Sequence, residues 1–160
     1  MRNLRTRARR DGDEWVIDGH KMWIGNGGIA NVHVVNATVD PELGHRGQAM
    51  FIVPGGTPGL ECVRKLKKLG CRASHTAELR FDECRIPGDH LLGGDEKLEK
   101  RLSDARADKT RSAALGAFEQ TRPMVAAQAL GIGRAALEFA SEYAKERVQF
   151  GVPIAMHQAV

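Results

Sequence analysis

The chain has 160 residues, a mass of 17.5 kDa and a formal net charge of +4. This length suits one ordinary domain, or one small domain with part of a second, and excludes a whole large enzyme. Hydrophobic residues make up 42% and charged residues 28%, close to the globular average, so we expect a folded protein with a packed core. No apolar run approaches the ~18 residues of a membrane helix. We therefore predict no membrane span and a cytoplasmic location.

The positive charge is concentrated at the start of the chain. The first ten residues hold five Arg and no acid, and the rest of the chain holds 19 basic and 20 acidic residues. This distribution favours a solvated strand or arm over a nucleic-acid-binding groove, and aromatic residues at 5% leave little for base stacking. No nucleic-acid partner is expected. Cys62, Cys71 and Cys84 include no Cys-x-x-Cys pair, so we predict reduced thiols and no metal site.

Residues 13–87 predict a β domain. The expected strands lie at 14–17, 20–24, 32–39, 48–53 and 76–82. Asp18-Gly19 favours a type I′ hairpin turn between the first two, and the apolar residues that alternate along the last strand are expected to face inward. Because several short strands follow one another without helices, an antiparallel sandwich or barrel is favoured over a parallel α/β sheet.

The second half of the chain changes to a helical periodicity. From Met124 to Arg147 apolar residues recur every three or four positions, which predicts one long helix of ~36 Å that begins near Pro123. A helix this apolar normally packs in a bundle, and the chain ends before further helices, so we predict the start of an incomplete C-terminal helical bundle. Between the halves, residues 88–94 predict a linker and residues 95–111 a solvated, partly frayed helix.

Three motifs have both a functional and a structural interpretation. WIGNGG at 23–28 places a large aromatic before glycines that let a flat ligand approach the backbone, or it is a core Trp beside a loose turn. Thr121 and Arg122 precede a proline, which suits the first turn of a helix. They either present a hydroxyl and a cation at a helix N-terminus, which favours anions, or mark a plain helix start. GIGRAA at 131–136 matches G-x-G-x-x-A, but no strand precedes it, so it predicts close helix packing.

Seven segments, taken in order, resemble the acyl-CoA dehydrogenase family, and most closely its medium-chain-like members. The segments are GHKMWI (19–24), NGGIAN (26–31), FIV (51–53), TPGL (57–60), LGCRAS (69–74), FEQTRP (118–123) and YAKERVQFG (143–151). The resemblance spans nearly the whole chain apart from 95–112, where this sequence is longer and more charged than the family's loop. The predicted fold class is α+β: a middle β domain of the barrel or sandwich type at 1–94, then the start of a C-terminal helical domain, truncated, at 95–160.

The resemblance implies site residues at the positions that match. Trp23 and Ile24 match the stretch that lies against the flavin ring of FAD, and Gly25 stands where the family usually has a Thr whose hydroxyl can reach the flavin edge. The implied acyl-CoA contacts are Glu119, Thr121 and Arg122. The segment at 147–151 matches one that reaches the FAD of a neighbouring subunit, which implies Arg147, Gln149 and Phe150 as FAD contacts, with a guanidinium that suits phosphate. His157 and Gln158 resemble a further FAD contact.

The resemblance also implies a reaction of fatty acid metabolism. The family's oxidoreductases carry out α,β-dehydrogenation of acyl-CoA thioesters with hydride transfer to FAD, and their catalytic base is a Glu expected beyond residue 160. We therefore assign no catalytic residue and expect these residues alone to be inactive. The implied partners are an electron-transfer flavoprotein or similar acceptor and further copies of the chain in a homodimer or homotetramer. The alternative is a noncatalytic flavin-binding, acyl-CoA-binding or interaction module that has lost the base.

Overall fold

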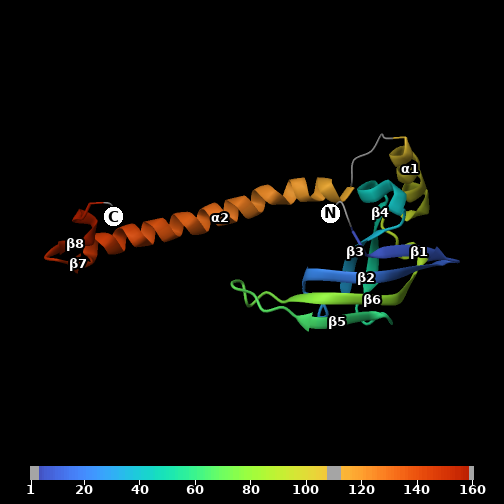
Figure 1. Ribbon diagram of the computed structural model, residues 1–160, viewed down its shortest axis with the longest axis horizontal. Helices are drawn as coiled ribbons and strands as arrows, with labels where there is room; N and C mark the ends of the chain where they lie inside the picture. Colours follow the sequence, from blue (N-terminus) through green and yellow to red (C-terminus); the bar gives the residue numbers. More distant parts are fainter. Residues whose placement is uncertain (1–3, 108–112, 159–160) are drawn as a thin grey trace. The chain divides into compact units, whose positions relative to one another are not determined.

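The computed structural model describes residues 4–107 and 113–158. They form two compact units, Met1–Ala114 and Leu115–Val160, which we describe separately. The first unit contains a six-stranded sheet and a short helix, and the second contains a long helix and a small hairpin, as the labels of Figure 1 show. The predicted α+β class, with strands first and a long helix after them, is confirmed.

The sheet of the first unit is mixed. Its strands are β1 (Arg7–Asp11), β2 (Glu14–Gly25), β3 (Val32–Thr38), β4 (Gln48–Pro54), β5 (Leu60–Lys65) and β6 (Thr76–Pro87). They lie in the order β4-β3-β1-β2-β6-β5, and every neighbouring pair is antiparallel except β1 and β3, which are parallel. Within the described residues β4 and β5 are the two edges, so hydrogen bonds do not close the sheet into a barrel.

The predicted hairpin turn at Asp18-Gly19 is wrong, because β2 runs through both residues without a break. The turn lies earlier, at Gly12 and Asp13, where β1 and β2 meet. Gly19 has a φ of 135°, and a Cβ built on it would lie 2.8 Å from the Thr6 Cα. The glycine at position 19 therefore permits Thr6, which precedes β1, to approach β2 closely, and a turn prediction from the dipeptide alone does not reveal this.

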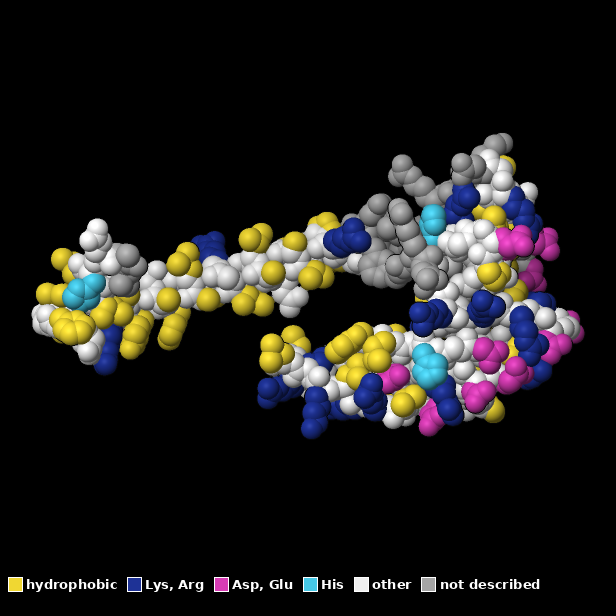
Figure 2. Space-filling view, viewed as in Figure 1, with side chains coloured by type: hydrophobic (Ala, Val, Ile, Leu, Met, Phe, Trp, Pro, Cys, Tyr) yellow, Lys and Arg dark blue, Asp and Glu magenta, His cyan; other side chains and the backbone are white. Residues whose placement is uncertain are grey.

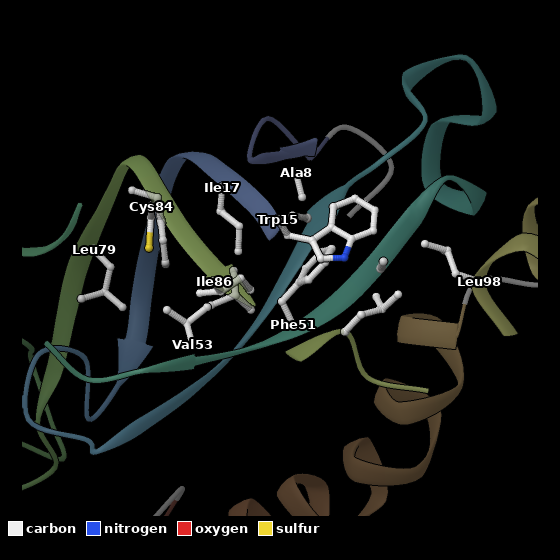
Figure 3. Close-up of a cluster of buried hydrophobic side chains, with 14 residues drawn as sticks. Ala8, Trp15, Ile17, Phe51, Val53, Leu79, Cys84, Ile86 and Leu98 are labelled. Carbon is white, nitrogen blue, oxygen red and sulfur yellow. The ribbon is translucent and has the colours of Figure 1, made fainter. Parts of the chain in front are cut away.

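The core lies on one face of the sheet and is drawn in Figure 3. The rings of Trp15 and Phe51 pack at its centre with their centroids 5.1 Å apart. The alternation predicted for β6 is confirmed, since its apolar residues Ala77, Leu79 and Phe81 are all buried. The core extends past the sheet through apolar residues of the linker and the first helix, so hydrophobic burial joins these segments to the β strands.

Helix α1 (Gly94–Arg106) confirms the predicted solvated helix; residues 108–112, where that prediction ended, lie outside the described residues. It buries only Leu98 and Ala105. Arginines attach it to the sheet unit: the Arg101 guanidinium donates to the Gln48 carbonyl, and Arg106 lies 2.9 Å from the Asp40 carboxylate. The linker before α1 is ordered as a short 3-10 helix, η2 (Gly88–His90), and a second one, η1 (Pro41–Arg46), joins β3 to β4.

The second unit is built on helix α2 (Ala113–Glu146), which is one helix as predicted. Its predicted start at Pro123 is wrong, because the helix begins ten residues earlier and Pro123 lies inside it. The stretch AALGAFEQ at 113–120 is rich in strong helix formers, which offset the cost of about 3 kcal/mol for an internal proline. After α2 come β7 (Val148–Gln149), β8 (Val152–Pro153) and η3 (Ile154–Met156). In the part of the chain described here, no helix is long and apolar enough to cross a membrane.

The close approach of Thr6 to Gly19 gives a stability prediction. Gly19→Ala should lower the free energy of unfolding by about 2–4 kcal/mol, because the new Cβ meets backbone and the φ is unfavourable. Gly12→Ala is the matched control: its φ of 60° is also positive, but a Cβ there meets nothing within 4 Å, so the loss should be about 1 kcal/mol. Urea unfolding followed by circular dichroism measures both values. Equal losses of unfolding free energy in the two variants would show that the close approach of Thr6 is not what requires glycine at position 19.

Candidate functional site

An extra residue in β2 forms a bulge opposite β6. Lys21 pairs with Leu79, and the next pair is Ile24 with Ala77, so β2 advances by three residues where β6 advances by two. Within this bulge Trp23 has a φ of 63°, a left-handed conformation that is rare for a bulky residue and costs roughly 1–2 kcal/mol. A bulge changes the direction in which a side chain points. The bulge therefore turns Trp23 out of the normal alternation of the strand.

The indole of Trp23 faces solvent. Its exposed fraction is 63%, whereas Trp15, the other tryptophan, is 6% exposed and belongs to the core. The interpretation of Trp23 as a core residue is therefore wrong. A large aromatic side chain that is both strained and exposed gains little from burial, which points to a contact surface for a flat ligand. Ile24, the next residue, is half-buried and packs against the core, so it anchors the strand beneath the bulge.

The residues that follow the bulge make a tight turn. Asn26 and Gly28 have φ values of 55° and 80°, and the Asn26 carbonyl accepts hydrogen bonds from the amides of Ile29 and Ala30. Gly25, the last residue of β2, has open space where a Cβ would stand. A threonine at position 25 would therefore fit sterically, so the absence of the hydroxyl is a chemical difference and not a requirement of packing.

A basic hollow lies at the β5–β6 hairpin, one strand away from the bulge. Its volume is about 630 Å³, and its lining residues are Lys65, Leu66, Lys67, Lys68 and Arg72. Lys65 and Ile24 both pair with Ala77 of β6, so the hollow and the bulge share one end of the sheet. Figure 2 shows Lys and Arg side chains together with hydrophobic ones at this end of the first unit.

The four cations of the hollow have no carboxylate partner within salt-bridge distance among the described residues. Residues 62–77 contain five Lys or Arg and no Asp or Glu. The hollow therefore favours anions. The balanced charge of the chain after residue 10 hides this hollow, and only the local excess of cations at 62–77 indicates it. Among the described residues no group of three or more His, Cys, Asp or Glu is placed to hold a metal ion.

A half-buried cation, Lys21, lies beside the bulge. The Lys21 amine donates to the Asn36 carbonyl over 2.6 Å and so connects β2 to β3. Burial lowers the pKa of Lys21 to about 8, because desolvation disfavours the charged form. This hydrogen bond thus fixes β2 at Lys21, directly before Met22 and Trp23.

The second unit brings most of its predicted site residues together in one corner. Arg147 follows α2 directly, and its carbonyl accepts a hydrogen bond from the Ile154 amide. Phe150, at the tip of the β7–β8 hairpin, is 94% exposed, and its ring lies edge-on to His157 with the centroids 6.0 Å apart. The His157 ring donates from Nε2 to the Gln149 carbonyl at 3.3 Å. Gln158 is exposed beside them, so this corner presents one cation, two amides and two rings.

The residues expected to contact the substrate are far from this corner within the second unit. Thr121 and Arg122 are exposed and lie inside α2, so the interpretation of this segment as a helix entrance is wrong. At 1.5 Å per residue, Arg122 is roughly 37 Å from Arg147 along the helix axis. The side chain of Glu119 lies outside the described residues. Thr121 and Arg122 therefore belong to a different contact surface from that of Arg147.

Comparisons with known proteins agree with this organisation. Residues 1–84 match the family described as "Acyl-CoA dehydrogenase, middle domain", and residues 111–160 match "Acyl-CoA dehydrogenase, C-terminal domain". The chain belongs to the acyl-CoA dehydrogenase family. It is 42% identical over 158 residues to a probable acyl-CoA dehydrogenase of Mycobacterium leprae, a match that covers 99% of this chain and 38% of the relative.

Two further relatives give the same result. The short-chain specific acyl-CoA dehydrogenase of Bos taurus mitochondria is 44% identical over 155 residues, which cover 97% of this chain and 35% of that protein. The solved structure of butyryl-CoA dehydrogenase from Megasphaera elsdenii is 36% identical, with a TM-score of 0.76, and the match covers 98% of this chain and 38% of that one. The chain thus spans less than two fifths of the length of each of these relatives.

The strained conformation of Trp23 can be tested by comparing two replacements. Both Trp23→Ala and Trp23→Gly remove the indole, but only Ala keeps the cost of a positive φ, so the Gly variant should be more stable by about 1 kcal/mol. Val34, which is exposed on β3, is the control: there Gly should be less stable than Ala by about 0.5–1 kcal/mol. Urea unfolding of the four variants gives the two differences. The same sign at both positions would contradict the left-handed bulge.

Proposed function

We propose that this chain contributes to an FAD-dependent acyl-CoA dehydrogenase, an oxidoreductase that introduces a double bond between the α and β carbons of an acyl-CoA thioester. The observation that carries the proposal is the exposed, outward-turned Trp23 in a chain of this family. The whole reaction belongs to the proposal because the chain spans only part of the length of its relatives. The acyl chain length, including the medium-chain-like expectation, stays a prediction.

The first unit fits the ring system of FAD. Trp23 offers an aromatic face and Ile24 an apolar edge, and Gly25 leaves its backbone open to a flat ligand. When bound, FAD supplies the acceptor for the hydride that leaves the β carbon. Trp23 would hold and orient the ring and exclude water from one face. Because position 25 has no hydroxyl, only its backbone is available for hydrogen bonds to the ring edge.

The corner of the second unit fits the phosphates of FAD from a neighbouring subunit. Arg147 has no carboxylate partner among the described residues, so its guanidinium is free to pair with a phosphate. Gln149, Phe150, His157 and Gln158 follow it along the chain and offer polar atoms and rings to the cofactor. This role supports a homodimer or homotetramer, in which one copy completes the cofactor site of another.

The basic hollow fits the phosphate groups of acyl-CoA. Its four cations share one end of the sheet with the residues proposed to face the flavin ring. An acyl-CoA thioester carries its negative charges at the end away from the reacting acyl carbons. Anions drawn to the hollow would thus leave the acyl chain free to reach toward the bulge. Glu119, Thr121 and Arg122 keep their proposed role as further substrate contacts.

The remaining proposals follow from the family. An electron-transfer flavoprotein or similar acceptor would reoxidise the flavin, and the three unpaired cysteines support a reducing compartment such as the cytoplasm. The inactivity of these 160 residues by themselves and the domain boundary after residue 94 stay predictions. The second candidate function is a noncatalytic flavin- or acyl-CoA-binding module. Gly25 favours it specifically, because the hydroxyl that can tune the flavin edge is missing.

The proposed cofactor role is tested by FAD titration. Arg147→Ala should weaken FAD binding about tenfold or more, because a charge-assisted hydrogen bond to phosphate contributes about 1.5–3 kcal/mol. Arg134→Ala is the matched control on α2, since the Arg134 guanidinium is already paired with Glu138 at 2.7 Å. Fluorescence quenching with added FAD gives the dissociation constants. Equal values for the two variants would refute Arg147 as a cofactor ligand, and no FAD binding by the parent chain would refute the flavin proposal for it.

The proposed role of the hollow is tested with butyryl-CoA. Replacing both Lys65 and Lys67 by Gln should lower the affinity about 3- to 10-fold at low salt, because two cations that attract phosphate are lost. The difference in affinity between the parent and this variant should shrink as salt is added, since screening weakens the attraction of both proteins for the phosphates. Replacing Lys97 and Lys100 of α1 by Gln removes the same charge from another surface and should change the affinity little. Calorimetric titration at two ionic strengths decides; equal losses in both double variants would exclude the hollow as the phosphate site.

A further inference from the structure

His75, the residue before β6, contacts the turn after the bulge twice. The Asn26 amide donates to the His75 carbonyl over 2.9 Å. The His75 ring returns to the same turn, with Nε2 at 2.9 Å from the Gly27 carbonyl oxygen. Because a carbonyl oxygen can only accept, this contact requires a proton on Nε2. His75 therefore binds two successive residues of the turn, one through its backbone and one through its side chain.

Cys62 and Ala77 also limit where the turn can lie. The Cys62 thiol of β5 donates to the Gly27 carbonyl at 3.8 Å, and a Cβ on Gly28 would come within 2.6 Å of the Cys62 sulfur. A Cβ on Gly27 would lie 3.1 Å from the Ala77 Cβ. The turn thus packs closely against β5 and β6. Of the two side chains that reach the Gly27 carbonyl, the His75 ring makes the stronger contact, since a thiol is a weak donor.

The turn is coupled to Trp23 over a short length of chain. The Gly27 amide donates to the Ile24 carbonyl over 3.2 Å, so the residue that binds His75 also binds the residue that follows Trp23. The strained φ of Trp23 persists only if the chain is fixed on both sides of it. On one side Lys21 is fixed by its bond to Asn36, and on the other the turn is fixed by His75.

We propose that His75 is a positioning residue: through the Gly27 carbonyl it fixes the turn at residues 25–28 and so holds the Trp23 indole in its outward orientation for the flavin ring. This inference rests on the proposed flavin function. His75 itself does not contact the ligand in this role. Gln is the conservative replacement, because its side-chain amide can donate to the same carbonyl, whereas Ala cannot.

The experiment compares His75→Ala, His75→Gln and a control in the parent chain. The control is His20→Ala, whose ring is exposed and contacts Glu78 instead of the turn. Amide hydrogen exchange measured by NMR reports the turn without any ligand. In His75→Ala the amides of Ile29 and Ala30 should exchange about tenfold faster, core amides such as those of Val16 and Val53 should be unchanged, and His75→Gln should restore most of the protection.

FAD titration with the same proteins reports the consequence for the ligand. His75→Ala should raise the FAD dissociation constant about tenfold and shift the visible absorption of bound flavin, while His75→Gln and His20→Ala stay within about threefold of the parent. Unchanged exchange at the turn in His75→Ala would overturn the inference. Faster exchange with unchanged FAD affinity would also overturn it, and would leave the proposed flavin function intact. If the parent binds no FAD, the proposed function fails, and hydrogen exchange still decides whether His75 fixes the turn.

Discussion

The candidate site depends on two opposed bulges in the pairing of β2 with β6. Between the pairs of Ile17 with Cys84 and Gly19 with Phe81, β6 has one extra residue, and between the pairs of Lys21 with Leu79 and Ile24 with Ala77, β2 has one. The two bulges compensate each other, so the strands recover their pairing at Gly25 and Thr76. Side chains in a strand alternate, so Trp23 would face the core like Trp15 and Ile17 if β2 were regular. The extra residue before Ile24 reverses this order, which places Trp23 outward and Ile24 against the core. The exposed indole, the glycine turn and the neighbouring hollow all take their positions from this pairing.

Charge pairing divides the first unit into two surfaces. Arg9 of β1 pairs with Glu83 at 2.9 Å, and Arg85 of β6 pairs with Asp11 at 2.9 Å. The Arg10 guanidinium lies over the Trp15 ring, 5.4 Å from its centroid, and near Asp95. Arg64 at the end of β5 is also paired, with Glu78 at 2.8 Å, whereas the four cations of the hollow have no such partners among the described residues. The hollow next to Trp23 therefore carries cations that are available to an anion.

The sequence predicted the elements whose periodicity is long and uniform. Helix α2 and the inward residues of β6 were identified because apolar residues repeat at regular spacings. The start of α2 was misplaced because one proline was given more weight than the helix formers before it. The Asp18-Gly19 dipeptide does not identify a turn, because glycine permits a positive φ both in a turn and inside a strand that a neighbouring segment approaches closely.

The orientation of Trp23 is a different kind of property, since no local pattern contains it. It follows from the register of β2 against β6, which lies more than fifty residues later in the chain. The same is true of His75, whose partners Asn26 and Gly27 are brought to it by that pairing. Family resemblance pointed to Trp23 through its motif, but the contact with His75 required the fold. The left-handed backbone at the bulge explains why the Trp23 side chain points to solvent and not into the core.

The most direct measurement is an NMR study of Trp23 in the isotopically labelled chain, before and after FAD is added. A positive φ brings the amide proton of a residue close to its own Hα, so the bulge predicts a strong intraresidue NOE between these protons at Trp23. On addition of FAD, the indole protons of Trp23 should gain NOEs to the flavin ring, and those of the buried Trp15 should not. A weak intraresidue NOE, typical of an extended strand, together with an indole unaffected by FAD, would contradict the bulge as the basis of the site.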